Sequence, residues 1–347
     1  MRNKERFHAY LNDASKSPLF ICGDSLNVLR LLPSASVDFC MTSPPYWNQR
    51  EYSNGGIGLE EDYIGYIENL LKVTREVYRV LKREGSFWLN LGDSYVKKRQ
   101  IGVPWRVALA LTDQQGWIMR NDVVWHKIKG MDTSRDKLRP VHEYIFHLVK
   151  QDRYFYDIDA IRTKPRQAIV KNGAVTTATG VTGVKYKRQI ELSTALSDSE
   201  KLQATKALEK TLRQLESGEI SDFRMIIRKQ HRTTHSDSSR VSGRAKELAE
   251  KGFYFLFYHP KGSKPGDVWE IVPEDTTKRG AHYASYPEDL CKIPIISTCP
   301  PDGLVLDPFC GTGTTNLVAF QMGRKSVGID ISREYIEYAA ERCHILL

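Results

Sequence analysis

Residues Gly303–Ser332 read GLVLDPFCGTGTTNLVAFQMGRKSVGIDIS, and this stretch decides the fold. The apolar residues Val305 and Leu306 predict the end of a buried strand, and Thr314 lies where a helix should begin. The run SVGID predicts a second strand that ends at Asp330. Strand, glycine loop, helix and second strand in this order are typical of an α/β fold with a largely parallel sheet.

The loop in this stretch has the parts of a nucleotide-cofactor site. Asp307 offers a carboxylate at the first strand tip, Gly311 and Gly313 let the backbone approach a ligand, and Asp330 can bind ribose hydroxyls. A P-loop needs a lysine after its glycines, and a dinucleotide fingerprint needs a third glycine where Asn316 stands. A nucleoside cofactor without phosphates remains, and S-adenosyl-L-methionine is the natural candidate. The alternative is a tight turn with a helix cap.

A second unusual stretch, MTSPPYW, occupies Met41–Trp47 and follows the apolar run VDFC. Two consecutive prolines end a strand, because each removes a backbone donor and fixes φ. The sequence therefore predicts a stiff loop carrying a hydroxyl and two aromatic rings at a strand end, where α/β sheets bind ligands. The alternative is a proline-rich turn whose aromatic rings belong to the core.

The segments around these loops alternate between strand and helix patterns. Residues 63–85 have apolar side chains at helical spacing and predict an amphipathic helix that ends at Gly85. A further helix is expected from about Ser197 to Leu215. Strands are expected within residues 18–33, 86–93, 118–127 and 142–150. This alternation supports an α/β class for both ends of the chain.

Composition limits the protein class. The chain has 347 residues, of which 41% are hydrophobic and 27% charged, an ordinary globular mixture. Its six cysteines form no CxxC pair, so we expect neither a zinc site nor a disulfide framework. The N-terminal sequence has no apolar signal region, and no run is long enough to span a membrane. We therefore expect a cytoplasmic protein.

The positive charge is concentrated in the middle of the chain. Residues 161–250 hold 18 Lys and Arg against 10 Asp and Glu, which is +8 of the net charge of +9. The stretch is poor in large apolar residues and rich in Ser, Thr and Gly, which is typical of a flexible linker or a small DNA-contacting insert. Arg232, Arg240 and Arg244 in it are candidates for phosphate or base contacts.

The two loops together resemble those of the β group of DNA amino-methyltransferases. TSPPYW lies near one end of the chain and DPFCGTGTT with GID near the other, so the catalytic loop precedes the cofactor loop. The resemblance covers residues 18–160 and 252–347. It implies the S-adenosylmethionine-dependent methyltransferase fold with circularly permuted motif order: a twisted, mostly parallel seven-stranded sheet with helices on both faces.

The resemblance also implies a division of the chain and roles for particular residues. The catalytic half would span residues 1–160, an inserted target-recognition region 161–251, and the cofactor half 252–347. The catalytic loop would be Ser43, Pro44, Pro45 and Tyr46. The cofactor would be held by Asp307, Phe309, Gly311, Gly313, Asp330, Asp24, Tyr283 and Pro287. No metal is implied, and the product is S-adenosyl-L-homocysteine.

The catalytic loop suits transfer to an exocyclic amino group. Such a nitrogen is a poor nucleophile, because its lone pair is delocalised into the base. The Ser43 hydroxyl and the Pro44 carbonyl are rigid acceptors that would localise and aim the lone pair. The base has to be flipped out of the duplex, and Tyr46 can stack on it. Trp47 can contact the DNA in the same way or pack in the core.

Cytosine N4 is the expected target. Methylation at cytosine C5 would need a Pro-Cys nucleophile, and Pro44-Pro45 stands at the corresponding place. In the family, Ser-Pro-Pro-Tyr usually accompanies cytosine N4 and Asp-Pro-Pro-Tyr adenine N6, so Ser43 favours cytosine. Adenine N6, an RNA or protein substrate, and a DNA-binding module without activity remain alternatives.

The expected partners follow from this function. They are double-stranded DNA and, functionally, a restriction endonuclease, with no stable complex and no membrane implied. DNA binding would associate the protein with the nucleoid.

Asp93, in NLGDSY, is a candidate for the base pocket or for capping a loop. Among the histidines only His231 and His235 have HxxxH spacing, and their Ser-, Thr- and Arg-rich surroundings favour a solvated or phosphate-contacting role over a metal site.

Overall fold

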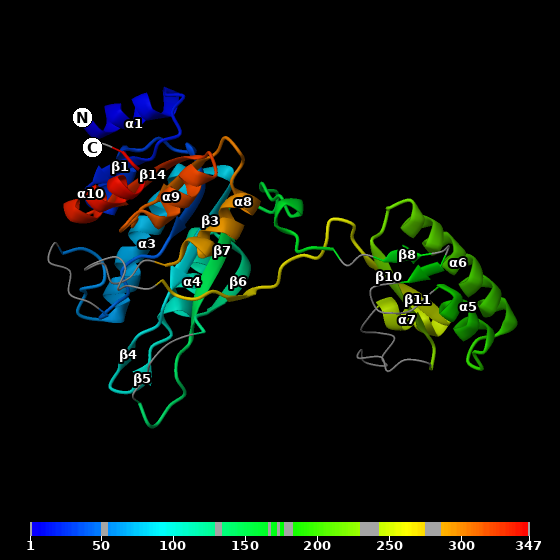
Figure 1. The fold of residues 1–347 in the computed structure, drawn as a ribbon. Helices are drawn as coiled ribbons and strands as arrows, with labels where there is room; N and C mark the ends of the chain where they lie inside the picture. Colours follow the sequence, from blue (N-terminus) through cyan, green and yellow to red (C-terminus); the bar gives the residue numbers. More distant parts are fainter. Residues whose placement is uncertain are drawn as a thin grey trace. The chain divides into compact units, whose positions relative to one another are not determined.

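A computed structural model places the chain in two compact units, residues 1–160 with 266–347 and residues 161–265 (Figure 1). Each unit is considered by itself. The structure describes residues 2–49, 55–128, 134–165, 168–171, 174–176, 183–229, 243–274 and 286–345.

The first unit is built on a sheet whose described strands run in the order β1-β14-β13-β2-β3-β7-β6-β12. All neighbouring strands are parallel except the two pairs that include β7. The expected parallel α/β sheet is confirmed, and the short edge strand β12 adds an eighth strand. The strands are β1 (Leu19–Cys22), β2 (Val37–Thr42), β3 (Leu81–Leu91), β6 (Ile118–His126), β7 (His142–Val149), β12 (Val268–Glu270), β13 (Leu304–Asp307) and β14 (Lys325–Asp330).

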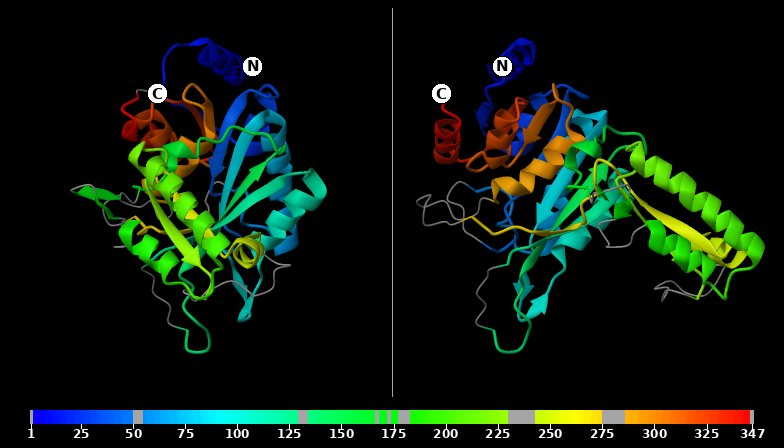
Figure 2. Two further views of the ribbon diagram at one scale, coloured as in Figure 1. Left: turned by 90° about the vertical axis from the view of Figure 1, so that its right-hand side faces the viewer. Right: turned by 45° about the vertical axis from the view of Figure 1, so that its right-hand side comes forward.

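Helices cover both faces of this sheet (Figure 2). Strand residues alternate between two hydrophobic cores, with Cys40 and Leu306 in the core on α2, α3 and α4, and Phe39 and Val305 in the core on α8 and α9. The helices are α1 (Arg2–Asn12), α2 (Ser25–Leu31), α3 (Tyr63–Val80), α4 (Val103–Gln115), α8 (Glu288–Thr298), α9 (Thr314–Gln321) and α10 (Arg333–Arg342). A hairpin, β4 (Tyr95–Val96) and β5 (Arg99–Gln100), completes this unit, and the 3₁₀ turn Asp159–Ile161 spans the boundary after residue 160.

Helix α3 ends five residues before the expected end at Gly85. Its start is fixed by the Asp62 side chain, which accepts a hydrogen bond from the Gly65 amide at 2.8 Å. From Leu81 the chain pairs with Val37 and continues as β3. The helical spacing of apolar residues therefore could not reveal the point at which the chain enters the sheet.

The second unit has its own core around the antiparallel pair β10 and β11. Its longest helix is stabilised by a capping box, in which Ser197 and Glu200 exchange side-chain and backbone hydrogen bonds. Tyr186, Leu208 and Phe223 are among the buried residues. The elements are β8 (Ile169–Lys171), β9 (Ala174–Thr176), α5 (Gly183–Glu191), α6 (Asp198–Glu216), β10 (Asp222–Ile227), α7 (Gly243–Lys251) and β11 (Phe253–Tyr258).

The division differs from the expected one after residue 251. Residues 252–265 were expected in the cofactor half, but they belong to the second unit. The reason is β11, which pairs along its whole length with β10, from Ile227 opposite Phe253 to Asp222 opposite Tyr258.

Candidate active site

Four parallel strands bring the two sequence motifs to one edge of the sheet. In the register of β1, β14, β13 and β2, Cys22 lies opposite Asp330, Asp307 opposite Gly328, and Leu306 opposite Cys40. The carboxyl ends of parallel strands share an edge. The segments that carry Asp24, Ser43, Asp307 and Asp330 therefore start from this edge.

The glycine loop leaves backbone open beside Asp330. Gly311 has φ +50°, and a Cβ added there would have no neighbour within 4 Å. Its amide donates to Asp330 Oδ2 at 2.9 Å. Gly313, with φ +73°, precedes the first turn of α9. The expected helix start at Thr314 is confirmed, and the loop offers space for a ligand close to the main chain.

The two acids at this end of the sheet are held in fixed orientations. Asp330 accepts a second backbone hydrogen bond from Ser332 at 2.8 Å, and burial raises its pKa. Gly23 donates to the Asp330 carbonyl at 2.9 Å, which brings the neighbouring Asp24 to the same corner. The exposed carboxylate of Asp24 caps α2 by accepting from Asn27 at 2.9 Å.

These residues fit a nucleoside cofactor that lacks phosphates. Open backbone at Gly311 gives room, and the carboxylates of Asp24 and Asp330 are acceptors for amino and hydroxyl groups. Phe309 adds a half-buried aromatic ring on the same loop. No lysine or arginine lies in the loop from Asp307 to Gly313 to balance a phosphate charge.

Asp307 differs from its neighbours because its carboxylate points into the protein and is 1% exposed. Oδ1 accepts from Thr42 at 2.6 Å and from the Phe309 amide at 3.1 Å. Oδ2 accepts from Thr315 at 2.6 Å and from Tyr286 at 3.2 Å. Burial raises the pKa of Asp307 to about 6, although these hydrogen bonds oppose the shift. Asp307 thus joins β2, the glycine loop and the segment before α8.

Helix α3 holds the loop of residues 43–46, the proposed catalytic loop, in place. Strand β2 ends at Thr42, and Ser43 follows it half-buried. The hydroxyl of Tyr66, a fully buried residue of α3, donates to the Pro45 carbonyl at 3.0 Å. The prolines and this hydrogen bond keep the main chain of the loop in one position.

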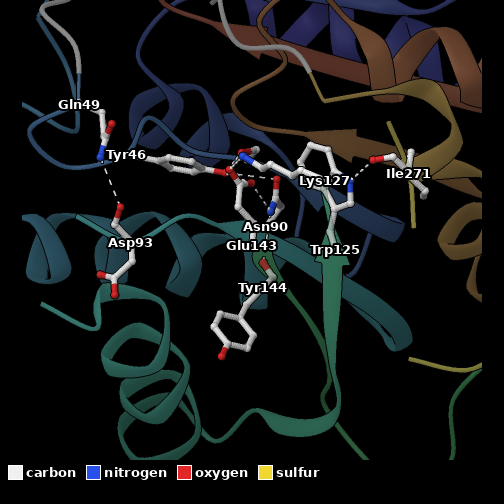
Figure 3. A network of polar contacts seen from close by, with 10 residues as sticks. Tyr46, Gln49, Asn90, Asp93, Trp125, Lys127, Glu143, Tyr144 and Ile271 are labelled. Carbon is white, nitrogen blue, oxygen red and sulfur yellow. Dashed lines mark hydrogen bonds and ion pairs between the residues drawn. The ribbon is translucent and has the colours of Figure 1, made fainter. Parts of the chain in front are cut away.

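Tyr46 connects the loop to a polar network (Figure 3). Its hydroxyl donates to Glu143 Oε2 at 2.7 Å and receives a hydrogen bond from Ser43 Oγ at 3.2 Å. Asn90 Nδ2 also donates to Glu143 Oε2, at 3.1 Å, and Lys127 forms an ion pair with Glu143 Oε1. The four segments that meet here are the catalytic loop, the end of β3, the end of β6 and the start of β7.

The Tyr46 ring is also closely packed, against the main chain at Gly92. A Cβ added at Gly92 would lie 2.5 Å from Tyr46 Cε2, so only glycine leaves room for the ring there. Burial, with the charge of Glu143, raises the pKa of Tyr46 well above its ordinary value. Tyr46 is therefore a neutral phenol in a fixed position at neutral pH.

Comparisons with known proteins agree with this geometry. The model of the family described as DNA methylase (N6_N4_Mtase) matches residues 37–341. The Type II methyltransferase M.SfiI of Streptomyces fimbriatus is 34% identical, over 92% of this chain and 89% of its own length. The chain belongs to the DNA methylase family.

Solved structures share the fold of the methylase. The PvuII DNA methyltransferase, titled cytosine-N4-specific, has a TM-score of 0.58 at 18% identity, over 94% of this chain and 86% of that chain. TTHA0409 of Thermus thermophilus, complexed with S-adenosyl-L-methionine, has a TM-score of 0.50 at 20% identity, over 94% of this chain and 92% of its own.

Two residues whose roles the sequence left open have structural partners in the methylase. Trp47 is 6% exposed and donates through Nε1 to the Glu60 carbonyl at 2.9 Å, which favours core packing over DNA contact. The Asp93 carboxylate accepts from the amides of Gly102 at 3.0 Å and Val103 at 2.9 Å. This favours the capping role for Asp93.

Other expected residues are placed only in part. Tyr283, Arg232 and Arg240 lie outside the described residues. Pro287 is the residue before the first turn of α8, and Arg244 is exposed on α7. Their expected roles toward cofactor and DNA stay predictions.

Several residues of the site were missed by the sequence reasoning, because their contacts join distant segments. Tyr46 and Glu143 are 97 positions apart, and Thr42 and Asp307 are 265 apart. One signal was present at Glu143, an acidic residue at the start of the apolar strand HEYIFHLV, where a buried charge requires a partner. Lys127 supplies it.

Metal sites and membrane spans are both absent from the part of the chain that the structure describes. Among these residues, no group of three or more His, Cys, Asp or Glu is arranged to hold a metal ion. No helix within the same residues is both long and apolar enough to span a membrane.

Proposed function

We propose that this methylase transfers the methyl group of S-adenosyl-L-methionine to the N4 amino group of a flipped cytosine in double-stranded DNA. It would act at a specific site and serve as the modification enzyme of a restriction-modification system. The proposal keeps the restriction endonuclease as a functional partner, without a stable complex.

One observation carries the proposal. Thr42, the residue before Ser43, donates to Asp307 at 2.6 Å, and Asp307 in turn receives the amide of Phe309. The end of β2, directly before Ser43, and the start of the glycine loop are thereby joined through one carboxylate. An amino group held at Ser43 would face a cofactor held at Gly311.

The residues of the chain would act by orientation. Bound S-adenosyl-L-methionine supplies a sulfonium methyl group as the electrophile. Ser43 Oγ and the Pro44 carbonyl would accept hydrogen bonds from the amino group and direct its lone pair at that methyl group. Tyr46 would contact the flipped base. The cofactor would be held or enclosed by Asp24, Phe309, Gly311, Gly313, Asp330, Tyr283 and Pro287. Asp307, also expected to hold it, is buried with four hydrogen bonds and would act by positioning the glycine loop.

Cytosine is favoured by Ser43, since the Ser-Pro-Pro-Tyr form of the loop resembles the cytosine-N4 type. Adenine N6 is the second candidate, because a serine hydroxyl can accept from either amino group. The cytosine-N4 specificity of the PvuII enzyme agrees with the first candidate but belongs to a protein only 18% identical.

Recognition of the DNA site is assigned to the second unit. Its positive charge is suited to a phosphate backbone, and Arg232, Arg240 and Arg244 are the proposed contacts. We place the recognition region at residues 161–265 rather than 161–251, because β11 is part of the same sheet as β10. A cytoplasmic location remains a prediction.

The proposal is tested with purified protein, cofactor carrying a labelled methyl group, and duplex DNA, single-stranded DNA or RNA of mixed sequence. Label is expected in duplex DNA for the wild type and for the control Ser15→Ala, and at least 100-fold less for Ser43→Ala. Label in RNA but not in duplex DNA would contradict the proposed substrate.

A further inference from the structure

The Ser43, Tyr46 and Glu143 side chains form a directed chain of hydrogen bonds. Ser43 Oγ donates to the Tyr46 hydroxyl at 3.2 Å, and that hydroxyl donates to Glu143 Oε2 at 2.7 Å. A second acceptor for Tyr46, Asn90 Oδ1, is longer at 3.3 Å. Both hydroxyl protons thus point away from the base position and toward Glu143. The lone pairs of Ser43 Oγ are left to accept from an amino group.

Methylation of an amino group releases a proton that the site has to accept. A nitrogen that attacks through its lone pair while it keeps both hydrogens becomes positively charged. Asn90 is a neutral amide that cannot take a proton, and the hydroxyls of Ser43 and Tyr46 can only pass one on. Within this network the group able to keep the proton is the carboxylate of Glu143.

The other acids near the loop are occupied. Asp93 receives two backbone amides at the start of α4. Asp307 receives four hydrogen bonds and is 1% exposed. No described hydrogen bond links either carboxylate to Ser43 or Tyr46.

We propose that Glu143 accepts the proton released by methyl transfer, through a relay formed by Tyr46 and Ser43. This inference rests on the proposed function. As the amino nitrogen bonds to the methyl carbon, the carbon–sulfur bond breaks and its electron pair stays on sulfur. The N–H proton moves to Ser43 Oγ, the Ser43 proton to the Tyr46 oxygen, and the Tyr46 proton to Glu143 Oε2. The sulfonium becomes a neutral thioether and the carboxylate a neutral acid, so charge and atoms balance.

Lys127 and the fold keep Glu143 ready for this role. Lys127 pairs with Oε1, which leaves Oε2 facing Tyr46. The side chain of Glu143 is 10% exposed and that of Lys127 is 29% exposed, so the ion pair reaches from the interior toward solvent. Lys127 and Tyr46 are the titratable groups in contact with Glu143 among the described residues. Lys127 is already protonated and cannot take the proton, so Glu143 returns it to water before the next reaction.

The test is single-turnover methyl transfer by Glu143→Gln with saturating cofactor and duplex DNA. Glutamine keeps a carbonyl acceptor for Tyr46 but takes no proton. We expect the transfer rate to fall at least 100-fold, while the dissociation constants for cofactor and DNA stay within threefold. The matched control is Glu76→Gln, which removes a carboxylate that is 19% exposed and paired with Arg79 at 2.7 Å. It should retain the wild-type rate.

The pH profile separates proton acceptance from a structural role. The wild-type rate should fall at acidic pH, because a protonated Glu143 cannot accept, and Glu143→Gln should lack this dependence. Glu143→Asp keeps a carboxylate and should transfer the methyl group at least tenfold faster than Glu143→Gln. Tyr46→Phe breaks the relay, so Tyr46→Phe/Glu143→Gln should be no slower than the slower single variant.

Three results would overturn the relay. They are a Glu143→Gln rate within threefold of the wild type, an unchanged acidic limb in that variant, and Glu143→Asp no faster than Glu143→Gln. If the wild type itself transfers no methyl group to DNA, the proposed function fails, and the relay fails with it. If the wild type is active and the variant is too, only the relay fails.

Discussion

At the scale of single residues, Asp307 joins the two loops of the site through a buried charge. Its four donors come from Thr42, Phe309, Thr315 and Tyr286. A buried carboxylate is tolerated when its acceptor sites are filled, but burial still disfavours the ionised form. Burial outweighs the hydrogen bonds, so the free energy of unfolding should depend on pH through the protonation of Asp307.

The pKa of Asp307 rises from 3.8 to about 6 on folding, so the folded state binds more protons than the unfolded state between these values. Stability from this residue is therefore lost as pH rises from about 4 to about 6, by about 3 kcal/mol. The measurement is the free energy of unfolding in urea at pH 4 and at pH 7, for the wild type and for Asp307→Asn. The difference between the two proteins should decrease by about 3 kcal/mol from pH 4 to pH 7. Subtraction removes the opposite dependence of His147, whose pKa is lowered to about 3 by burial.

The control for that measurement is Asp302→Asn, since the Asp302 side chain is 95% exposed. It should share the pH dependence of the wild type. If Asp307→Asn also shares it, the buried-charge explanation is wrong.

Gly311 provides a second prediction at residue scale, with Gly323 as its matched control. Both have positive φ, +50° and +71°, and a Cβ added at either would have no neighbour within 4 Å. Alanine at both positions should lower stability by a similar amount, of about 1 kcal/mol. Only Gly311→Ala should weaken cofactor binding by calorimetry, at least tenfold. Equal binding in the two variants would place the cofactor elsewhere.

At the scale of elements, helix α3 supports the proposed catalytic loop, residues 43–46, through one hydroxyl. Tyr66 is fully buried and donates to the Pro45 carbonyl, so Tyr66→Phe leaves a buried acceptor without its donor. We expect a loss of about 1 kcal/mol in stability and a decrease of several-fold in kcat. Tyr78→Phe on the same helix, whose ring packs on Trp117, should leave kcat unchanged. An equal kcat for Tyr66→Phe and Tyr78→Phe would contradict the supporting role of Tyr66.

The elements also show which features a sequence can reveal. The glycine loop, the start of α9 at Thr314 and the end of β14 at Asp330 follow from local chemistry, and all three were predicted. The helix end at Val80 was not, because it depends on pairing of Leu81 with Val37. The partner of Tyr46 was not predicted either, because Glu143 belongs to a strand 97 positions away.

At the scale of the whole molecule, the chain forms two units, each with its own sheet, and the positive charge lies in the second unit. The permuted order of the motifs was readable from their sequence, whereas the boundary at residue 265 depends on the pairing of β10 with β11. The second unit holds 21 Lys and Arg against 10 Asp and Glu, a net charge of +11, whereas the first unit is slightly negative, because the whole chain carries +9. DNA affinity should therefore depend on salt mainly through that unit.

The charge prediction concerns Arg232, Arg240 and Arg244 together. Replacing all three by Gln should lower the slope of log affinity against log salt by up to about 3, because each phosphate contact contributes about 0.9. Cofactor binding should not change. Replacing Arg30, Arg75 and Arg83, exposed residues of the first unit, removes the same charge and should alter the slope by less than about 1. Equal slopes for the two triple variants would contradict the assignment.

The central claim is that the Ser43 loop methylates the N4 amino group of cytosine in DNA. Its most direct test is mass spectrometry of nucleosides from the DNA of a methylation-free host that expresses the protein or its Ser43→Ala variant. The account predicts N4-methylcytosine with the wild type and none with the variant. N6-methyladenine in place of N4-methylcytosine would contradict the reading of Ser43, and no modified base would contradict the DNA methyltransferase activity itself.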